Sequence, residues 1–294
     1  MLMANTIYIV IPVFNRLQFT KECLDSLRKQ TYGEFKVIVV DDGSTDGTYQ
    51  HLKDNYPEAI VLQGDGNLWW TGATNMGVRK ALELSASHED YILTLNNDLV
   101  VIPEYLDELL KVAQAQKPCV VGSVSVNIKN ANKVEFAGLK WNKITAKYSR
   151  PKEFETDYKE LAAHHDFIET DLLPGRGTLI PIILFKQIGL FDQQNFPHYA
   201  ADDDFSLRSK KNGYQLLVST KAVVKSHVNE SGLEVINRNR KGRKTLSHLR
   251  ESFSSIRSGT NLNIRYKWAK KHTPVPPLYF MFDFMRIVYS FYFK

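Results

Sequence analysis

The chain turns from apolar to acidic within one short stretch, Lys36-Val37-Ile38-Val39-Val40-Asp41-Asp42-Gly43-Ser44. Three other runs rich in branched residues share its apolar character, at 7–11, 59–62 and 91–95. Helix-like segments separate these runs, at 19–30, 46–55, 72–84 and 103–115. Because strands that alternate with helices usually pair in parallel, the pattern predicts an α/β domain with a parallel sheet in the first half.

The second half is less regular. A strand at 119–126 is expected to continue the sheet, whereas 127–171 is polar, aromatic and aperiodic, as in loops with an antiparallel excursion. Order returns over 172–227, which we interpret as the second half of the same domain. There we expect an apolar segment, helices from Leu184 and over 202–212, and strands at 215–218 and 222–225.

Helices close the chain. We expect them at 244–271 and 277–293, joined by a proline-rich break that neither can continue through. The prediction is therefore one domain over 1–243, with halves at about 1–126 and 127–243. A helical C-terminal segment over 244–294 follows it.

Composition places the chain among globular proteins, with 43% hydrophobic and 24% charged residues in 294. Its cysteines, Cys23 and Cys119, fall in segments interpreted as buried and form no disulfide or zinc pattern, which favours a reducing cytoplasm. No signal core precedes the first strand. The net charge of +6 is concentrated after Lys221, at 238–244 and 265–271, which suits an anionic membrane, a phosphorylated substrate, nucleic acid or only a solvated helix face.

Carboxylates follow the second strand. Ligands bind beyond the carboxyl ends of parallel strands, so Asp41 and Asp42 are placed to hold one. Asp41 can instead start a turn, and Asp46 is expected to cap the next helix. Asp42 differs, because its carboxylate can accept the N3 proton of uracil or thymine.

A polar trio, Asn96-Asn97-Asp98, ends the fourth strand. Such side chains need partners, and a divalent cation with a ribose would supply them. Magnesium and manganese accept one aspartate when phosphate oxygens complete the coordination. Turn or cap roles remain the alternative.

Two further motifs are candidates for ligand contact. In the segment 64–77, glycines allow close approach, Asn75 can hold phosphate or sugar oxygens, and Trp69 and Trp70 offer either core packing or a platform for a sugar. The acidic triplet 202–204 opens a helix, which charge at a helix N-terminus alone can explain. His227 becomes a plausible metal ligand only in the company of Asp98.

Together and in this order, the motifs resemble family 2 glycosyltransferases, the inverting enzymes of the GT-A fold, and in particular their rhamnosyltransferase-like branch. The resemblance covers about 7–227 and rests on the segments 11–16, 41–44, 66–77, 96–98, 174–177 and 202–208. It implies a Rossmann-like, mostly parallel sheet flanked by helices, with a nucleotide-binding half followed by an acceptor half. The implied cofactor is Mn²⁺ or Mg²⁺.

By position, the resemblance implies that Asp42 reads a pyrimidine, Asn97 lies by the ribose, Asp98 binds the metal with His227 as accessory ligand, and Asp202 is the catalytic base. It also implies donor contacts at Pro12, Val13, Asn15, Asn67, Trp70, Gly72 and Asn75, and acceptor contacts at Gly175, Arg176 and Asp203. Two departures stand out: the metal motif has one carboxylate, and Ala201 replaces a glutamate that precedes the base.

The expected reaction moves a sugar from a UDP- or dTDP-sugar to a hydroxyl of a glycan or lipid-linked glycan, in surface polysaccharide synthesis. A nicotinamide-dependent enzyme would need G-x-G-x-x-G after the first strand, and Pro12-Val13-Phe14-Asn15 stands there instead. An inactive carbohydrate-binding scaffold stays the alternative, and nucleic acid is not an expected partner. Residues 277–294 are expected to rest on the inner membrane surface without crossing it, or to pack on the domain or a dimer partner.

Overall fold

The four apolar runs of the first half become parallel strands in a computed structural model, which describes residues 5–227 and 246–293. They are β1 (Ile7–Val13), β2 (Phe35–Asp41), β3 (Ile60–Gln63) and β4 (Tyr91–Thr94). β1 lies between β2 and β4, with Ile7 opposite both Phe35 and Tyr91, and β3 follows β2. The strands therefore end at one edge of the sheet, which confirms the predicted α/β arrangement.

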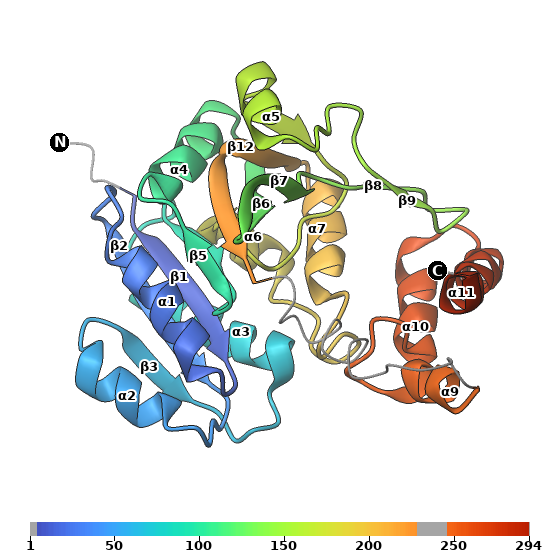
Figure 1. Cartoon of the computed structure of the whole chain (residues 1–294), viewed down its shortest axis with the longest axis horizontal. Helices are drawn as coiled ribbons and strands as arrows, with labels where there is room; N and C mark the ends of the chain where they lie inside the picture. Colours follow the sequence, from blue (N-terminus) through green and yellow to red (C-terminus); the bar gives the residue numbers. More distant parts are fainter. Residues whose placement is uncertain (1–4, 228–245, 294) are drawn as a thin grey trace.

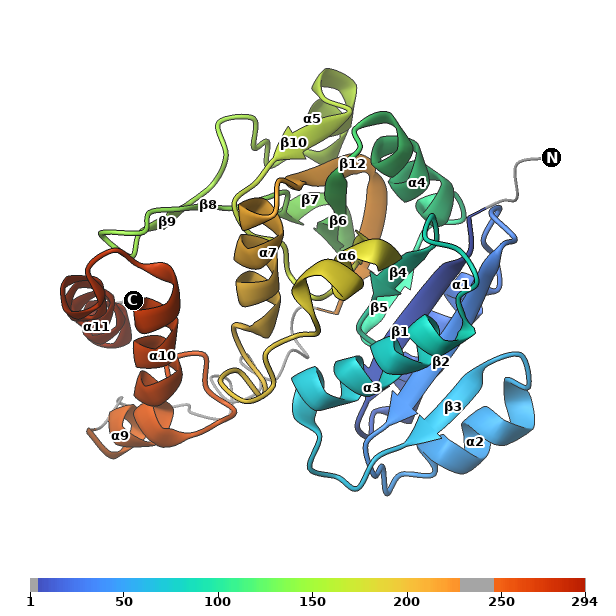
Figure 2. The same ribbon diagram turned by 180° about the vertical axis from the view of Figure 1, so that it is seen from behind.

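Helices cover both faces of the sheet (Figures 1 and 2). One face carries α1 (Leu17–Leu27), α2 (Thr48–Asn55) and α4 (Tyr105–Ala115), and the other carries α3 (Trp69–Leu84), α6 (Ile182–Ile188) and α7 (Ala201–Lys211). Side chains of β1 alternate between two cores, because Ile9 and Ile11 join the first helices while Tyr8 and Val10 join the second.

The second half completes the same sheet, but not as a simple continuation. β6 (Cys119–Asn127) does not adjoin β4, because β11 (Thr178–Pro181) is inserted antiparallel between them. β12 (Gln215–Ser226) pairs parallel with β6 and is one bulged strand where two were predicted, since the register shifts between Ser219 and Val223 and then resumes. The remaining members are β5 (Leu99–Val101), β7 (Asn130–Phe136) and β10 (Phe167–Glu169).

The aperiodic segment also carries a two-stranded hairpin and a short helix. Strands β8 (Lys140–Trp141) and β9 (Tyr148–Ser149) extend from the sheet toward the C-terminal helices, and α5 (Tyr158–His164) lies over β7 (Figure 1). The Trp141 indole donates a 2.9 Å hydrogen bond to the Tyr279 hydroxyl. This hairpin therefore ties the end of the chain to the domain.

The C-terminal segment contains α9 (Leu246–Ser254), α10 (Leu262–His272) and α11 (Pro276–Phe293). The single helix predicted over 244–271 is wrong, because the Asn261 side chain caps a new helix by accepting the Ile264 N–H at 3.1 Å. The predicted boundary at 243 and the basic stretch 238–244 lie outside the described residues.

Candidate active site

The turn that follows β2 is held by its own polar side chains. Asp41 accepts the Ser44 N–H at 2.9 Å, and the Ser44 hydroxyl accepts the Asn15 N–H at 2.7 Å. Asn15 in turn accepts the Thr45 N–H at 2.9 Å. Asp46 accepts from Thr48 at the start of α2, but the N-cap residue is Gly47, so Asp46 lies one residue before the predicted capping position. Asn15, predicted to contact donor, thus shapes the turn beside β1.

Asp42 is buried, and its carboxylate accepts three backbone hydrogen bonds. One oxygen accepts the Gly66 N–H at 2.9 Å, and the other accepts the N–H groups of Leu68 and Trp69 at 3.0 and 3.1 Å. Since each carboxylate oxygen has two lone pairs, one acceptor position remains on the oxygen that faces Gly66. Gly64 permits this packing, since a Cβ there would lie 2.5 Å from the Asp42 carboxylate.

Three further residues predicted to contact the donor lie near this carboxylate. The Val13 carbonyl accepts the Asp42 N–H at 2.8 Å, and Pro12 lies opposite Val40 in the sheet. Asn67 is exposed in a turn in which its N–H is accepted by Asp65. Pro12, Val13 and Asn67 therefore border Asp42, at the carboxyl edge of β1 and β2.

Helix α3 begins with residues that connect both halves of the domain. The half-buried Trp70 indole donates to the Asn96 side chain at 3.0 Å, and a Cβ on Gly175 would lie 2.2 Å from its ring. Gly72 packs against Gln193, where a Cβ would meet the side-chain amide at 2.7 Å. Asn75 is buried, and both ends of its amide bond the Phe191 backbone. We therefore assign Asn75 a structural role instead of a ligand contact.

The three polar residues after β4, Asn96, Asn97 and Asp98, contact different partners. Asn96 holds Trp70, while the Asn97 amide donates to the Thr20 hydroxyl of α1 at 2.9 Å. Asp98 is half-buried, with the Arg16 guanidinium 3.7 Å from its carboxylate. Asp98 is therefore the member of the trio whose charge is directed toward the start of α1.

The register of β12 and β5 places the two predicted metal ligands, Asp98 and His227, next to each other across the strand pair. Ser226 lies opposite Leu99 in the antiparallel pair of β12 and β5, so the next residues, His227 and Asp98, lie side by side. His227 contacts Glu22 at 3.0 Å through one ring nitrogen, so ligation would use the other nitrogen or replace this contact. Within 5–227 and 246–293, no group of three or more His, Cys, Asp or Glu side chains is arranged to hold a metal. Asp98 and His227 thus fit a cation only if a diphosphate supplies further oxygens.

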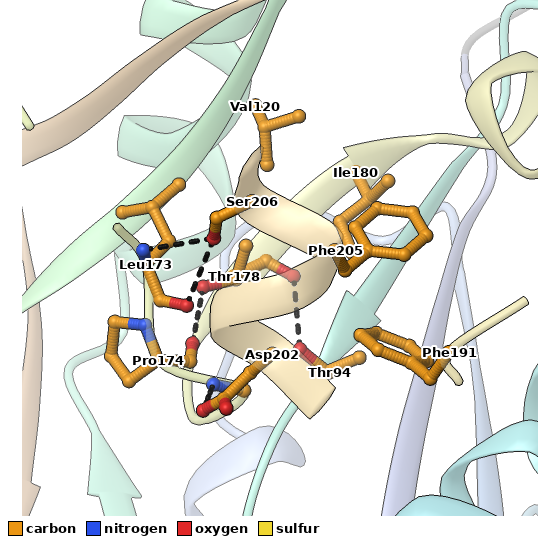
Figure 3. A pocket seen from close by; sticks show the side chains of 11 residues that line it. Thr94, Val120, Leu173, Pro174, Thr178, Ile180, Phe191, Asp202, Phe205 and Ser206 are labelled. Atoms are coloured by element: carbon orange, nitrogen blue, oxygen red, sulfur yellow. Dashed lines mark hydrogen bonds between the residues drawn. The ribbon is translucent and has the colours of Figure 1, made fainter. Parts of the chain in front are cut away.

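The loop before β11 meets the start of α7. Gly175 donates its N–H to the Asp202 carboxylate at 2.8 Å, and the Ser206 hydroxyl, one turn later, accepts the Leu173 N–H at 3.0 Å (Figure 3). Arg176 extends to the Ser226 hydroxyl at 3.4 Å, beside His227. The loop 173–176 therefore links the candidate base to the candidate metal ligands.

A small, mostly apolar cavity lies behind Asp202 (Figure 3). Its lining includes Val120, Ile180, Phe191 and Phe205. Desolvation in these surroundings raises the pKa of Asp202, against the hydrogen bond from Gly175 and the charge of Arg176. A carboxylate with a raised pKa is a better proton acceptor than an ordinary aspartate.

The three acidic residues of α7 have different surroundings. Desolvation and the Asp202 charge raise the pKa of Asp203 well above its usual range, while Arg265 opposes this. Asp204 is buried and contacts Arg208 at 2.8 Å, Lys271 at 2.6 Å and His272 at 2.8 Å. Burial raises the pKa of Asp204, but these partners outweigh it and hold the value at about 2.

Sequence reasoning did not find the partners of Asp204 on α10. The spacing of Asp204 and Arg208 within one helix could have indicated their ion pair. Lys271 and His272 had no such signal, because they follow more than 60 residues later on another helix. The same holds for the bond between Trp70 and Asn96, which only the fold brings together.

Known proteins with similar sequences and structures point to one family. The model for glycosyl transferase family 2 matches residues 8–170. Glycosyltransferase GlyG of Streptococcus pneumoniae is 28% identical over 124 residues, which cover 40% of this chain and 38% of that protein. UDP-N-acetylglucosamine–dolichyl-phosphate N-acetylglucosaminyltransferase of Methanococcus voltae is 32% identical over 143 residues, which cover 42% of this chain and 53% of that protein. The chain thus spans about half or less of the length of these relatives.

A crystal structure of GalNAc-T7 with UDP, GalNAc and Mn²⁺ shares the fold. It superposes with a TM-score of 0.60 at 14% sequence identity, covering 98% of this chain and 58% of that one. The mixed sheet, its flanking helices and the acidic strand ends are those expected of the GT-A fold. Because the family model spans more than half of the chain, the protein belongs to glycosyl transferase family 2.

Proposed function

We propose that this protein transfers a sugar from a UDP- or dTDP-sugar to an acceptor hydroxyl with inversion at the anomeric carbon. The observation that carries the proposal is a chain of contacts across the sheet edge. Asn96, beside Asp98, holds the Trp70 indole, the indole packs on Gly175, and Gly175 donates to Asp202. The Trp70 ring thus lies between Asn96, two residues before the candidate metal ligand, and Gly175, which donates to the candidate base.

Inversion in a single displacement needs a base on the acceptor side of the sugar, opposite the departing diphosphate. In the proposed reaction Asp202 takes the acceptor proton, and its raised pKa supports that role. Gly175 orients the carboxylate, and Arg176 offsets its charge. Asp203, one residue further, is the reserve candidate.

On the donor side, Asp42 would accept the pyrimidine N3–H with its remaining lone pair, and Asn97 would lie by the ribose. Asp98 and His227 would hold Mn²⁺ or Mg²⁺, which when bound offsets negative charge on the diphosphate. GalNAc-T7, solved with UDP and Mn²⁺, has the same fold and supports this choice of ion. We propose a glycan or lipid-linked glycan as the acceptor, and the cytoplasm as the location.

A thermal-shift screen of nucleotide sugars, each with Mn²⁺, Mg²⁺ or chelator, tests the donor assignment. Ligand at about 100 times its Kd adds roughly 2.7 kcal/mol of stability. We expect a rise in melting temperature with UDP- or dTDP-sugars, none with GDP-sugars, and loss of the metal-dependent part in Asp98→Ala. Equal shifts with GDP-sugars would contradict the assignment of Asp42 to a pyrimidine. Full turnover after exhaustive chelation would contradict the proposed metal requirement.

The screen also separates a transferase from an inactive scaffold. A transferase hydrolyses its donor slowly when metal is present and acceptor is not. A scaffold that binds the nucleotide sugar would show the thermal shift without release of UDP or dTDP.

A further inference from the structure

Helix α11 exposes an apolar stripe on the side away from the domain. We define the α11 stripe as Leu278, Met281, Met285, Tyr289 and Tyr292. Their spacing of three or four residues places them on one side of the helix, where Met281 is 46% and Met285 48% exposed. In Figures 1 and 2, α11 lies at the end of the molecule, with α10 between it and α7.

The opposite side of α11 is buried and contains the helix's acidic residue. Tyr279, Asp283 and Ile287 are at most 6% exposed. Asp283 contacts Arg286 at 2.6 Å and Arg265 of α10 at 3.4 Å. The aspartate that interrupts the apolar sequence is therefore turned inward, and the outward stripe has no acidic member.

The C-terminal segment that contains the stripe is basic. Residues 246–293 contain seven Lys and Arg against two acidic residues, a net charge of +5 within the chain's +6. On α10, Tyr266 is 50% exposed and contacts Phe280 of α11, with ring centroids 5.6 Å apart. Lys270 lies one helical turn from Tyr266 and Lys267 lies next to it, both on α10, the helix that packs against α11.

We propose that the α11 stripe rests on an anionic membrane surface, with its Met and Tyr side chains at the interface and Lys267 and Lys270 toward the headgroups. Among the described helices, none is both long and apolar enough to cross a bilayer. The proposed contact of the α11 stripe is with the membrane surface. A second copy fits less well, because two segments of charge +5 repel each other. This inference goes beyond the transfer reaction and does not depend on the sugar.

The membrane-binding surface is joined to the candidate base by buried contacts. Asp204, two residues after Asp202, contacts Lys271 and His272 at the end of α10. Membrane contact at α11 therefore holds α7 in a defined orientation to the bilayer. This consequence rests on the proposed function, because only a lipid-linked acceptor would make use of it.

Vesicle flotation of the full chain tests the proposal. The vesicles contain phosphatidylcholine alone or mixed with phosphatidylglycerol. We expect binding only to the mixed vesicles, weakened by salt. Lys267→Glu with Lys270→Glu should lower the partition coefficient by roughly 25-fold or more, since each cation contributes about fivefold. The matched control Lys53→Glu, on exposed α2, should leave binding unchanged.

The apolar contribution needs its own pair of variants. Met281→Glu with Met285→Glu should reduce binding by roughly tenfold or more, whereas Met281→Leu with Met285→Leu should retain it. Melting temperatures near that of the parent show that each variant folds. Donor hydrolysis in vesicle-free solution should be the same in all of them, which separates this proposal from the transfer reaction.

Three results would overturn membrane binding. The first is a parent chain that fails to float with mixed vesicles, and the second is a glutamate pair that floats as well as the leucine pair. The third is a parent dimer, seen by analytical ultracentrifugation, that the glutamate pair converts to monomer, in which case a second copy covers the stripe.

Discussion

Asp42 after β2 and Asp202 at the start of α7 are both carboxylates at the edge of the sheet, but their surroundings differ. Asp42 accepts three backbone N–H groups and so organises the loop around it. Asp202 accepts two, from Gly175 and Asp203, and lies over an apolar cavity that raises its pKa. In the proposed reaction, the surroundings of Asp42 therefore suit the shape of the donor loop, and those of Asp202 suit proton transfer.

The largest expected effect is on the acceptor side. Asp202→Asn keeps an oxygen for the Gly175 N–H but loses the base, so transfer should fall by about 10²- to 10⁴-fold. Turnover is measured at saturating donor, with donor affinity from calorimetry as the control, which should barely change. Asp203→Asn is the matched variant and should lose much less. If Asp202→Asn matches the parent, the base lies elsewhere and the comparison fails.

Asp204 sharpens the contrast within α7, because its role is stability. Asp204→Asn removes the buried carboxylate that Arg208, Lys271 and His272 contact, and Lys271 then keeps Asp192, so we expect a loss of about 3 kcal/mol in the free energy of unfolding. Urea denaturation measures it. The exposed Asp166→Asn should change little.

The dependence of stability on acidic pH should also show that Asp204 stabilises the fold. Its folded pKa of about 2 is below the usual 3.8, so its contribution is present above about pH 3.8 and is lost as the pH falls toward 2. Unchanged acid stability in Asp204→Asn would contradict the assignment.

Asp42 tests the other side of the comparison. Asp42→Ala leaves three N–H groups without their acceptor, so we expect about 1–3 kcal/mol of lost stability. Donor affinity should fall together with stability, because the loop around Gly66 and Trp69 loses its support. Thermal melting with and without UDP measures both. An unchanged melting temperature together with lost UDP binding would mean that Asp42 binds the pyrimidine ring and does not stabilise the loop.

The smallest effect concerns pH. Because the pKa of Asp202 is raised, kcat should fall about tenfold for each pH unit below that pKa. The Arg176 charge lowers this pKa, so Arg176→Gln should move the acidic limb of the kcat profile to higher pH. A limb that stays in place would show that the profile reports another group.

The sequence predicted the first half well because its signals are local. Apolar strands, turn residues and helix periodicity all lie within short windows, and the strand ends placed Asp42 and Asp98 at one edge. The insertion of β11 between β4 and β6 has no such signal, since strand order is decided by packing. The break before Asn261 did have one, the run Ser258-Gly259-Thr260-Asn261, which is typical of a turn and an N-cap.

For the candidate site, residue types indicated the chemistry but not which residues contact a ligand and which stabilise the fold. Asp42 and Asp98 could be selected from their positions after strands, whereas Asp202 was singled out within the triplet 202–204 by the family resemblance. That Asn75 bonds Phe191, and that Asp204 bonds α10, depends on contacts between distant segments. The metal and base assignments stay predictions until the variants are measured.

The position of β11 has a consequence for synthesis on the ribosome. Both neighbours of β11 in the sheet, β4 and β6, are translated before it. Until residue 181 has left the exit tunnel, the nascent chain holds two strands with open backbone edges and apolar side chains. Such edges can pair with other chains, so truncated products that end between 127 and 177 should aggregate. β11 fills the gap between β4 and β6, and β12, which is translated later, covers the remaining edge of β6.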